Sequence, residues 1–183
     1  MANVIQRIDH TTKTFGILIA MVSIVMLFGT FISSFFVLKI RLMSSVSLPG
    51  NTIMIGVVNT MIIIFSSISM MLAKFHYKND RMINYEIWLL WAIMTGILFI
   101  GGQLLLWSEL VTVGIPFTFG QLSDMVYLMS GAHGIHVIAG LFILYWLQSL
   151  SNELISLDLI KNVGLFWHFL CLIWVTLFTV TLV

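Results

Sequence analysis

The chain has 183 residues, of which 60% are hydrophobic and only 8% carry a charged side chain. Ordinary soluble domains carry charge on roughly a quarter of their residues, because polar groups cover their surface. A mean hydropathy of +1.10 therefore excludes a soluble globular domain, and it excludes a disordered chain as well. Eight Lys and Arg residues against seven Asp and Glu residues leave no basic excess that would suggest a nucleic-acid partner.

Five stretches are long and apolar enough to cross a bilayer, which takes about 20 apolar residues. Because lipid offers no partner to an unpaired backbone group, these stretches are predicted to be helices. We predict an all-α polytopic membrane protein, a single domain over residues 1–183 built as a bundle of five transmembrane helices. The predicted spans are residues 15–38, 52–73, 87–107, 125–147 and 163–183.

The basic residues of the loops predict the orientation, because cytoplasmic loops carry an excess of Lys and Arg. A cytoplasmic N-terminus places six basic residues inside and two outside, so we expect the N-terminus in the cytoplasm and the C-terminus outside. The acidic residues Glu109 and Asp124 are assigned to the loop between the third and fourth spans, as solvated charges. The six inner residues are Arg7, Lys13, Lys74, Lys78, Arg81 and Lys161, and the two outer residues are Lys39 and Arg41.

Polar side chains at membrane depth are costly, so those that occur fix helix contacts or mark sites. Asn59 in the second span and Gln103 in the third each carry an amide that needs partners on another helix. Each amide is therefore expected to fix a helix contact. The Ser, Thr and Gly residues of the first three spans are expected to allow close helix packing.

Three histidines lie inside the predicted spans. His133 and His136 are three residues apart and share one helix face, and His168 belongs to the fifth span. Imidazole is the commonest metal ligand, so one interpretation is a metal site or a haem between His168 and one of the other two. The other interpretation is neutral histidines that form hydrogen bonds across helices or to a lipid headgroup. Cys171 is the only cysteine, which excludes an intramolecular disulfide and a two-cysteine copper site.

Taken together, these motifs resemble subunit III of the haem-copper respiratory oxidases, the cytochrome c and quinol oxidases. The resemblance runs from about residue 15 to the C-terminus and is strongest over residues 131–137 with Gly140. Five spans are similar to the short bacterial form of the family, which lacks the first two helices of the longer members. The supporting pieces are Asn59-Thr60, Ser66-Ser67 with Met70, Gly102-Gln103 with Trp107 and Glu109, and Trp167-His168-Phe169 with Trp174.

The resemblance implies an accessory subunit of the bacterial inner membrane that has no cofactor and no catalytic residue of its own. Haem and copper would lie in the catalytic subunit I, which passes electrons from cytochrome c or quinol to oxygen and pumps protons. This chain would pack against subunit I and other oxidase subunits and hold phospholipids in a cleft. The three histidines would be polar contacts, not metal ligands. The residues expected to make structural or lipid-cleft contacts are Asn59, Gln103, Trp107, Glu109, His133, His136, Trp167 and His168.

Three positions depart from the pattern of that family. Where its members usually carry a carboxylate inside a span, this chain has Ile24, Leu106 and Cys171. A divergent branch of this kind is compatible with an atypical oxidase or with a nitric oxide reductase-type complex. A small membrane b-type cytochrome and an unrelated transporter or channel are the other hypotheses, and the lack of charged residues inside the spans disfavours the transporter.

Overall fold

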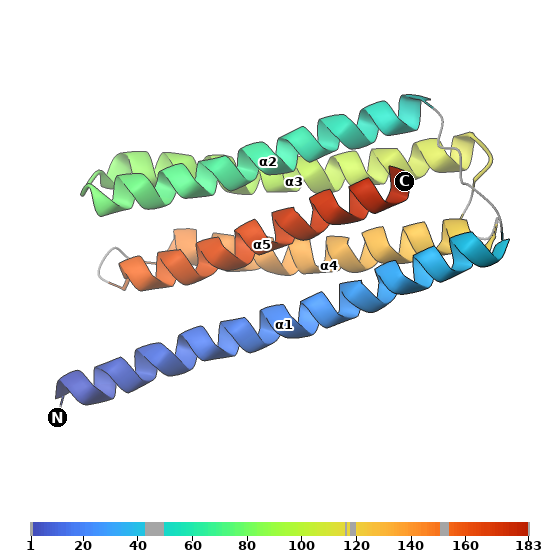
Figure 1. Cartoon of the computed structure of the whole chain (residues 1–183). Coiled ribbons are helices and arrows are strands. Elements are labelled where there is room, and N and C mark those ends of the chain that lie inside the picture. The colour runs from blue at the N-terminus through green and yellow to red at the C-terminus, as the bar shows by residue number, and fades with distance from the viewer. Residues whose placement is uncertain (1, 43–49, 116, 118–119, 151–153, 183) are drawn as a thin grey trace.

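Each of the five apolar stretches forms a helix (Figure 1). The first four helices extend beyond their predicted spans at both ends and the fifth at its start, while residue 183, the predicted end of the last span, lies outside the described residues. The computed structural model describes residues 2–42, 50–115, 117, 120–150 and 154–182, with only the backbone described for residues 2–14. All five helices contain a segment long and apolar enough to span a bilayer, which confirms the predicted all-α polytopic bundle. The helices are α1 (Ala2–Leu42), α2 (Gly50–Lys78), α3 (Met82–Thr112), α4 (Gln121–Ser149) and α5 (Leu157–Leu182).

Four of the helices close into a ring. α2 and α3 pack closely along their length, α3 contacts α4, α4 contacts α5, and α5 returns to α2. Within the described part of the chain, α1 contacts only α4 and α5, so it lies against the outside of the ring (Figure 1). Consecutive helices run in opposite directions, which places the α2–α3 turn and the start of α5 at the end of the bundle where α1 begins.

The core lies inside the ring, and a smaller cluster lies under α1. The ring interior buries large side chains from all four helices, including Ile63, Phe99, Leu144 and Trp167. α1 contributes the buried Phe28 and Phe35 to the second cluster, and most of its other side chains face outward. Outward-facing apolar side chains are stable in hydrocarbon, because lipid tails are as apolar as the side chains themselves.

The two acidic residues assigned to the third loop lie in helices, so that part of the prediction was wrong. Glu109 is in the last turns of α3, and Asp124 is in the first turn of α4. The prediction ended each span with its apolar run, but a helix satisfies its own backbone and can continue past the hydrocarbon edge. α3 ends where Gly114 adopts a φ of 85°, and the Ile115 N–H then donates to the carbonyl of Leu110.

Candidate functional site

Two tryptophans of α5 donate hydrogen bonds to hydroxyl groups of α2 inside the ring. The Trp167 Nε1–H donates to Ser66 Oγ at 3.2 Å, and the Trp174 Nε1–H donates to Thr60 Oγ1 at 3.1 Å. Ser66 Oγ–H in turn donates to the carbonyl of Ala92 on α3 at 2.7 Å. One chain of hydrogen bonds therefore ties α5, α2 and α3 together at membrane depth, where no water competes for these groups.

The Trp167 indole is held between two glycines as well as by its hydrogen bond. A Cβ atom added to Gly96 of α3 would lie 3.0 Å from the indole, and one added to Gly140 of α4 would also lie 3.0 Å from it. Both glycines therefore provide space that the indole occupies. The contact with the indole explains why position 140 of α4, four residues after His136, is a glycine.

Trp107 of α3 forms the same kind of hydrogen bond with a hydroxyl group of α4. The Trp107 Nε1–H donates to Ser130 Oγ at 3.1 Å, and the hydroxyl of Ser130 donates to the carbonyl of Val126 at 2.8 Å. Trp107 and Trp167, both expected to make structural contacts, thus lie at helix interfaces. Glu109, predicted with them, lies two residues after Trp107 and lines an outer groove instead.

The two amides predicted to fix helix contacts face each other across α2 and α3. The Asn59 Nδ2–H donates to Gln103 Oε1 at 3.5 Å, and the residues are only 1% and 3% exposed. The other amide atoms, Asn59 Oδ1 and Gln103 Nε2, have no hydrogen-bond partner among the described residues. The hydrogen bond between the two amides is therefore long, and it leaves the acceptor Asn59 Oδ1 and the donor Gln103 Nε2 unpaired.

The three histidines have three different environments. His133 is fully buried against the rings of Phe28, Phe99 and Trp174, at centroid distances of 6.1, 6.0 and 5.5 Å, and its two nitrogens form no hydrogen bond within the described residues. The half-buried His136 donates from Nδ1 to the carbonyl of Ala132 in its own helix at 2.7 Å.

His168 alone of the three shares a hydrogen bond with another helix, because its Nδ1 lies 2.6 Å from Ser67 Oγ of α2. Aromatic rings thus occupy the space beside His133, and a hydroxyl occupies Nδ1 of His168. This packing gives no support to a haem held between them. Across the ranges that the structure describes, no group of three or more His, Cys, Asp or Glu side chains is placed to hold a metal ion.

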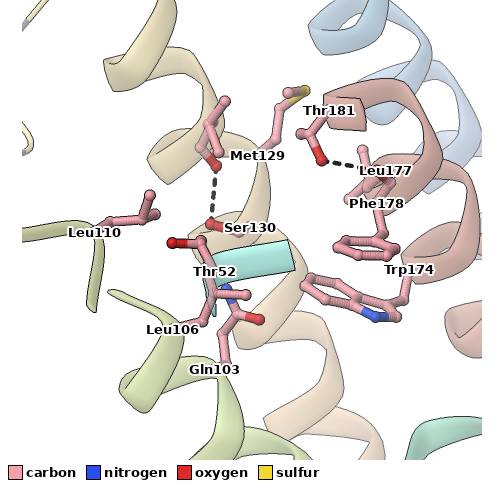
Figure 2. Close-up of a pocket in the computed structure, with 11 residues that line it drawn as sticks. Thr52, Gln103, Leu106, Leu110, Met129, Ser130, Trp174, Leu177, Phe178 and Thr181 are labelled. Atoms are coloured by element: carbon pink, nitrogen blue, oxygen red, sulfur yellow. Dashed lines mark hydrogen bonds between the residues drawn. The ribbon is translucent and has the colours of Figure 1, made fainter. Parts of the chain in front are cut away.

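A small pocket lies inside the ring near the end of α5 (Figure 2). Its volume of about 40 Å³ has room for no more than a few water molecules. Figure 2 shows Trp174 and Phe178 of α5 on one wall and Gln103 and Leu106 of α3 on another, with Thr52 of α2 beside Gln103. Gln103 is the one residue of the predicted set in this pocket, which is too small to hold a phospholipid.

The comparisons with known proteins agree on one family. The chain is 28% identical over 130 residues to the cytochrome bo(3) ubiquinol oxidase subunit 3 of Buchnera aphidicola, covering 67% of this chain and 66% of the relative. It is 30% identical over 128 residues to the cytochrome c oxidase subunit 3 of Bacillus sp. (strain PS3), covering 66% and 60%. It is 26% identical over 175 residues to the cytochrome c oxidase subunit 3 of Thermostichus vulcanus, covering 91% and 85%.

The chain is similar to subunit III of the haem-copper respiratory oxidases over most of its length. No protein-family model matches it. The chain spans about two thirds or less of the Buchnera and Bacillus relatives and most of the Thermostichus one. With five helices of membrane-spanning length, the chain is a multi-pass membrane protein.

The positions at which subunit III proteins usually carry intramembrane carboxylates are apolar in structure as well as in sequence. Leu106 is buried against the small interior pocket. Cys171 is buried, with its Sγ 3.6 Å from the carbonyl of Ile63. Ile24 packs against the cluster under α1. A carboxylate at Leu106 or Cys171 would be an unpaired buried charge in these surroundings, which is strongly unfavourable.

The sequence did not lead us to predict that Thr60, Ser66 and Ser130 accept hydrogen bonds from tryptophan side chains. A signal for two of them was present in the sequence. Trp167 and Trp174 are seven residues apart on α5, and Ser66 and Thr60 are six residues apart on α2, in the opposite order. At about 1.5 Å of rise per residue, these spacings match for two antiparallel helices.

Proposed function

We propose that this chain is the accessory, cofactor-free subunit III of a haem-copper terminal oxidase in a bacterial inner membrane. The observation that carries the proposal is the match to the Thermostichus cytochrome c oxidase subunit 3 over 91% of this chain and 85% of that one. The reaction belongs to the complex: electrons from cytochrome c or quinol reduce oxygen to water, coupled to proton pumping. In this proposal the haem and copper sites are in the partner subunits.

The physical task of the chain is to pack against the catalytic subunit and retain phospholipids at its surface. Three observations support this task. The Trp167–Ser66 and Trp174–Thr60 bonds hold the ring together from within. Ser66, Ser130 and His168 form hydrogen bonds within the chain, and the pocket of about 40 Å³ inside the ring is too small for a substrate. The outer surface presents large apolar side chains on every helix, which suits contact with lipid or with other helices.

The expected orientation is part of the proposal. The basic residues Lys74, Lys78 and Arg81 lie around the α2–α3 turn, at the same end of the bundle as the start of α5 (Figure 1). Lys39 and Arg41 lie in the last turn of α1, at the opposite end. We place the α2–α3 turn in the cytoplasm and the C-terminus outside, following the excess of basic residues on the inner side.

The decisive experiment is purification of the tagged chain from its native membrane in mild detergent, with an optical spectrum and identification of every co-purifying chain. We expect a larger, haem-bearing multi-span protein that can be dissociated to leave this chain colourless. A partner that reduces nitric oxide instead of oxygen would assign the chain to a nitric oxide reductase-type complex. A chain that purifies alone with haem would be a b-type cytochrome, and a colourless chain without partners would contradict all of these assignments.

A further inference from the structure

A groove of about 710 Å³ runs along the outer face of the α2–α3 hairpin, and only these two helices line it. Gly101 and Gly102 contribute no side chain to it, while Val58, Leu98 and Leu105 form apolar walls. This groove is separate from the small pocket inside the ring. Because these two adjacent glycines have no side chains, the backbone of a second helix can approach closely, as it commonly does at small residues between membrane helices.

The groove also contains an unsatisfied hydrogen-bond acceptor. Asn59 lines the groove but is only 1% exposed, and its Oδ1 lies against Gly102 with no hydrogen-bond partner in the described ranges. The Asn59 Nδ2–H is already used by Gln103. Lipid tails carry no donor, and a buried amide oxygen left unpaired in hydrocarbon is costly. The groove therefore suits an occupant that brings its own donor.

We propose, resting on the function proposed above, that this groove receives a transmembrane helix of the catalytic subunit. The incoming helix crosses over Gly101 and Gly102 and presents a Ser, Thr or Trp donor to the amide of Asn59, which can turn about its soft terminal torsion. This is the chemistry by which the chain joins its own helices, as at Trp167 and Ser66. A phospholipid tail in the same groove would leave the amide unsatisfied and would gain nothing from the glycines.

The polar end of the groove is consistent with this occupant. Asn51 and Glu109 lie at the end of the groove where α2 begins and α3 ends. Glu109 is half-buried and forms no ion pair within the described residues. Long Lys or Arg side chains near the end of a transmembrane helix can extend to the membrane interface. A basic residue at the end of the incoming helix would pair with the Glu109 carboxylate.

The test compares two substitutions of identical chemistry on opposite sides of the bundle. A Cβ atom added at Gly101 of α3 or at Gly134 of α4 meets no atom within 4 Å, so a side chain can begin at either position without a clash. We expect Gly101→Leu to fill the groove and lower recovery of the haem-bearing subunit on tagged purification at least five-fold. Gly134→Leu is expected to leave the recovery unchanged. Circular dichroism of both variants checks that the helices are intact.

A second measurement uses the full-length chain without blocking the groove. A photo-crosslinking residue is placed at Leu105 in the groove or at Ile135 on α4, which are 64% and 69% exposed. We expect a crosslink to the catalytic subunit from position 105 and none from position 135. Equal recovery of that subunit by both leucine variants, with no crosslink from position 105, would overturn the groove while leaving the proposed function intact.

Two further outcomes would show whether the groove inference alone is wrong or the proposed function as well. Loss of bound phospholipid in Gly101→Leu, with the catalytic subunit still recovered in full, would make the groove a lipid site and overturn the inference. Failure of the unaltered chain to recover any haem-bearing subunit would overturn the proposed function and the groove inference together.

Discussion

At the scale of single residues, the chain stabilises itself with indole and hydroxyl pairs rather than with charges. A buried indole N–H needs a partner, and Trp107, Trp167 and Trp174 each find a hydroxyl on a neighbouring helix without bringing a net charge into the membrane. Ser66 is the central case, because it accepts from Trp167 and donates to Ala92. One hydroxyl group thus connects three helices.

Replacement of Ser66 by alanine should therefore destabilise the bundle. Ser66→Ala leaves the Trp167 indole N–H and the Ala92 carbonyl without this partner, and we expect the free energy of unfolding to fall by about 1 kcal/mol. The measurement is unfolding of the purified chain in mixed micelles, followed by circular dichroism. Ser23→Ala is the control, because Ser23 is exposed and donates only to Ile19 of its own helix. Equal losses in the two variants would contradict the prediction.

Sequence reasoning at this scale identified which residue types need partners but not which partners they find. It predicted helix contacts for Asn59 and Gln103, and the structure places these two amides against each other. It expected polar contacts for all three histidines, yet only His168 shares a hydrogen bond with another helix among the described residues. The face that each side chain presents depends on how the helices are rotated, and this rotation is set by packing across the whole ring.

At the scale of the helices, the apolar runs alone predicted the number, order and type of the elements. The helix ends were predicted less well, since Glu109 and Asp124 were assigned to a loop and lie in α3 and α4. Hydropathy indicates where the hydrocarbon core of the membrane ends. The helix itself ends where the backbone leaves the helical conformation, here at the turn around Gly114. The pairing of the helices could not be predicted, because apolar runs do not say which faces meet.

Gly96 of α3 provides the space that Leu141 of α4 and the Trp167 indole occupy inside the ring. A Cβ atom in Gly96→Ala would lie 2.7 Å from Leu141 and 3.0 Å from Trp167, whose indole is held by Ser66. We expect this variant to lose about 1–3 kcal/mol of unfolding free energy through overpacking. In Gly101→Ala on the same helix, the added methyl group meets nothing within 4 Å. That control should be neutral or more stable by up to about 1 kcal/mol, because alanine favours the helix.

Thermal unfolding of the two variants in the same detergent provides the comparison. The isolated chain is used for this measurement, so that Gly101 has no partner helix beside it. A Gly96→Ala variant as stable as Gly101→Ala would show that the Trp167 indole and Leu141 can move apart at no cost, contrary to the packing described for them.

At the scale of the whole molecule, the architecture separates an internally satisfied ring from outer surfaces that remain available. α2 to α5 close on one another, and α1 lies on the α4–α5 side. The groove on the α2–α3 hairpin therefore lies on a part of the ring that α1 leaves uncovered. Neither the ring nor the groove follows from the order of the spans, because both depend on contacts between helices distant in the sequence. The similarity to subunit III of respiratory oxidases could be predicted from motifs.

The orientation of the whole bundle is open to a direct test. Asp80 in the α2–α3 turn and the C-terminus lie at opposite ends of the bundle (Figure 1). Because Lys74, Lys78 and Arg81 surround that turn, it should stay in the cytoplasm. A fluorescent protein fused after Asp80 should therefore fluoresce, and alkaline phosphatase fused there should be inactive. Both reporters fused after Val183 should behave in the opposite way, with phosphatase activity on the order of ten-fold higher than at Asp80. Phosphatase activity after Asp80 and fluorescence after Val183 would show that the bundle has the opposite orientation. The Glu109 end of the groove would then face the cytoplasm.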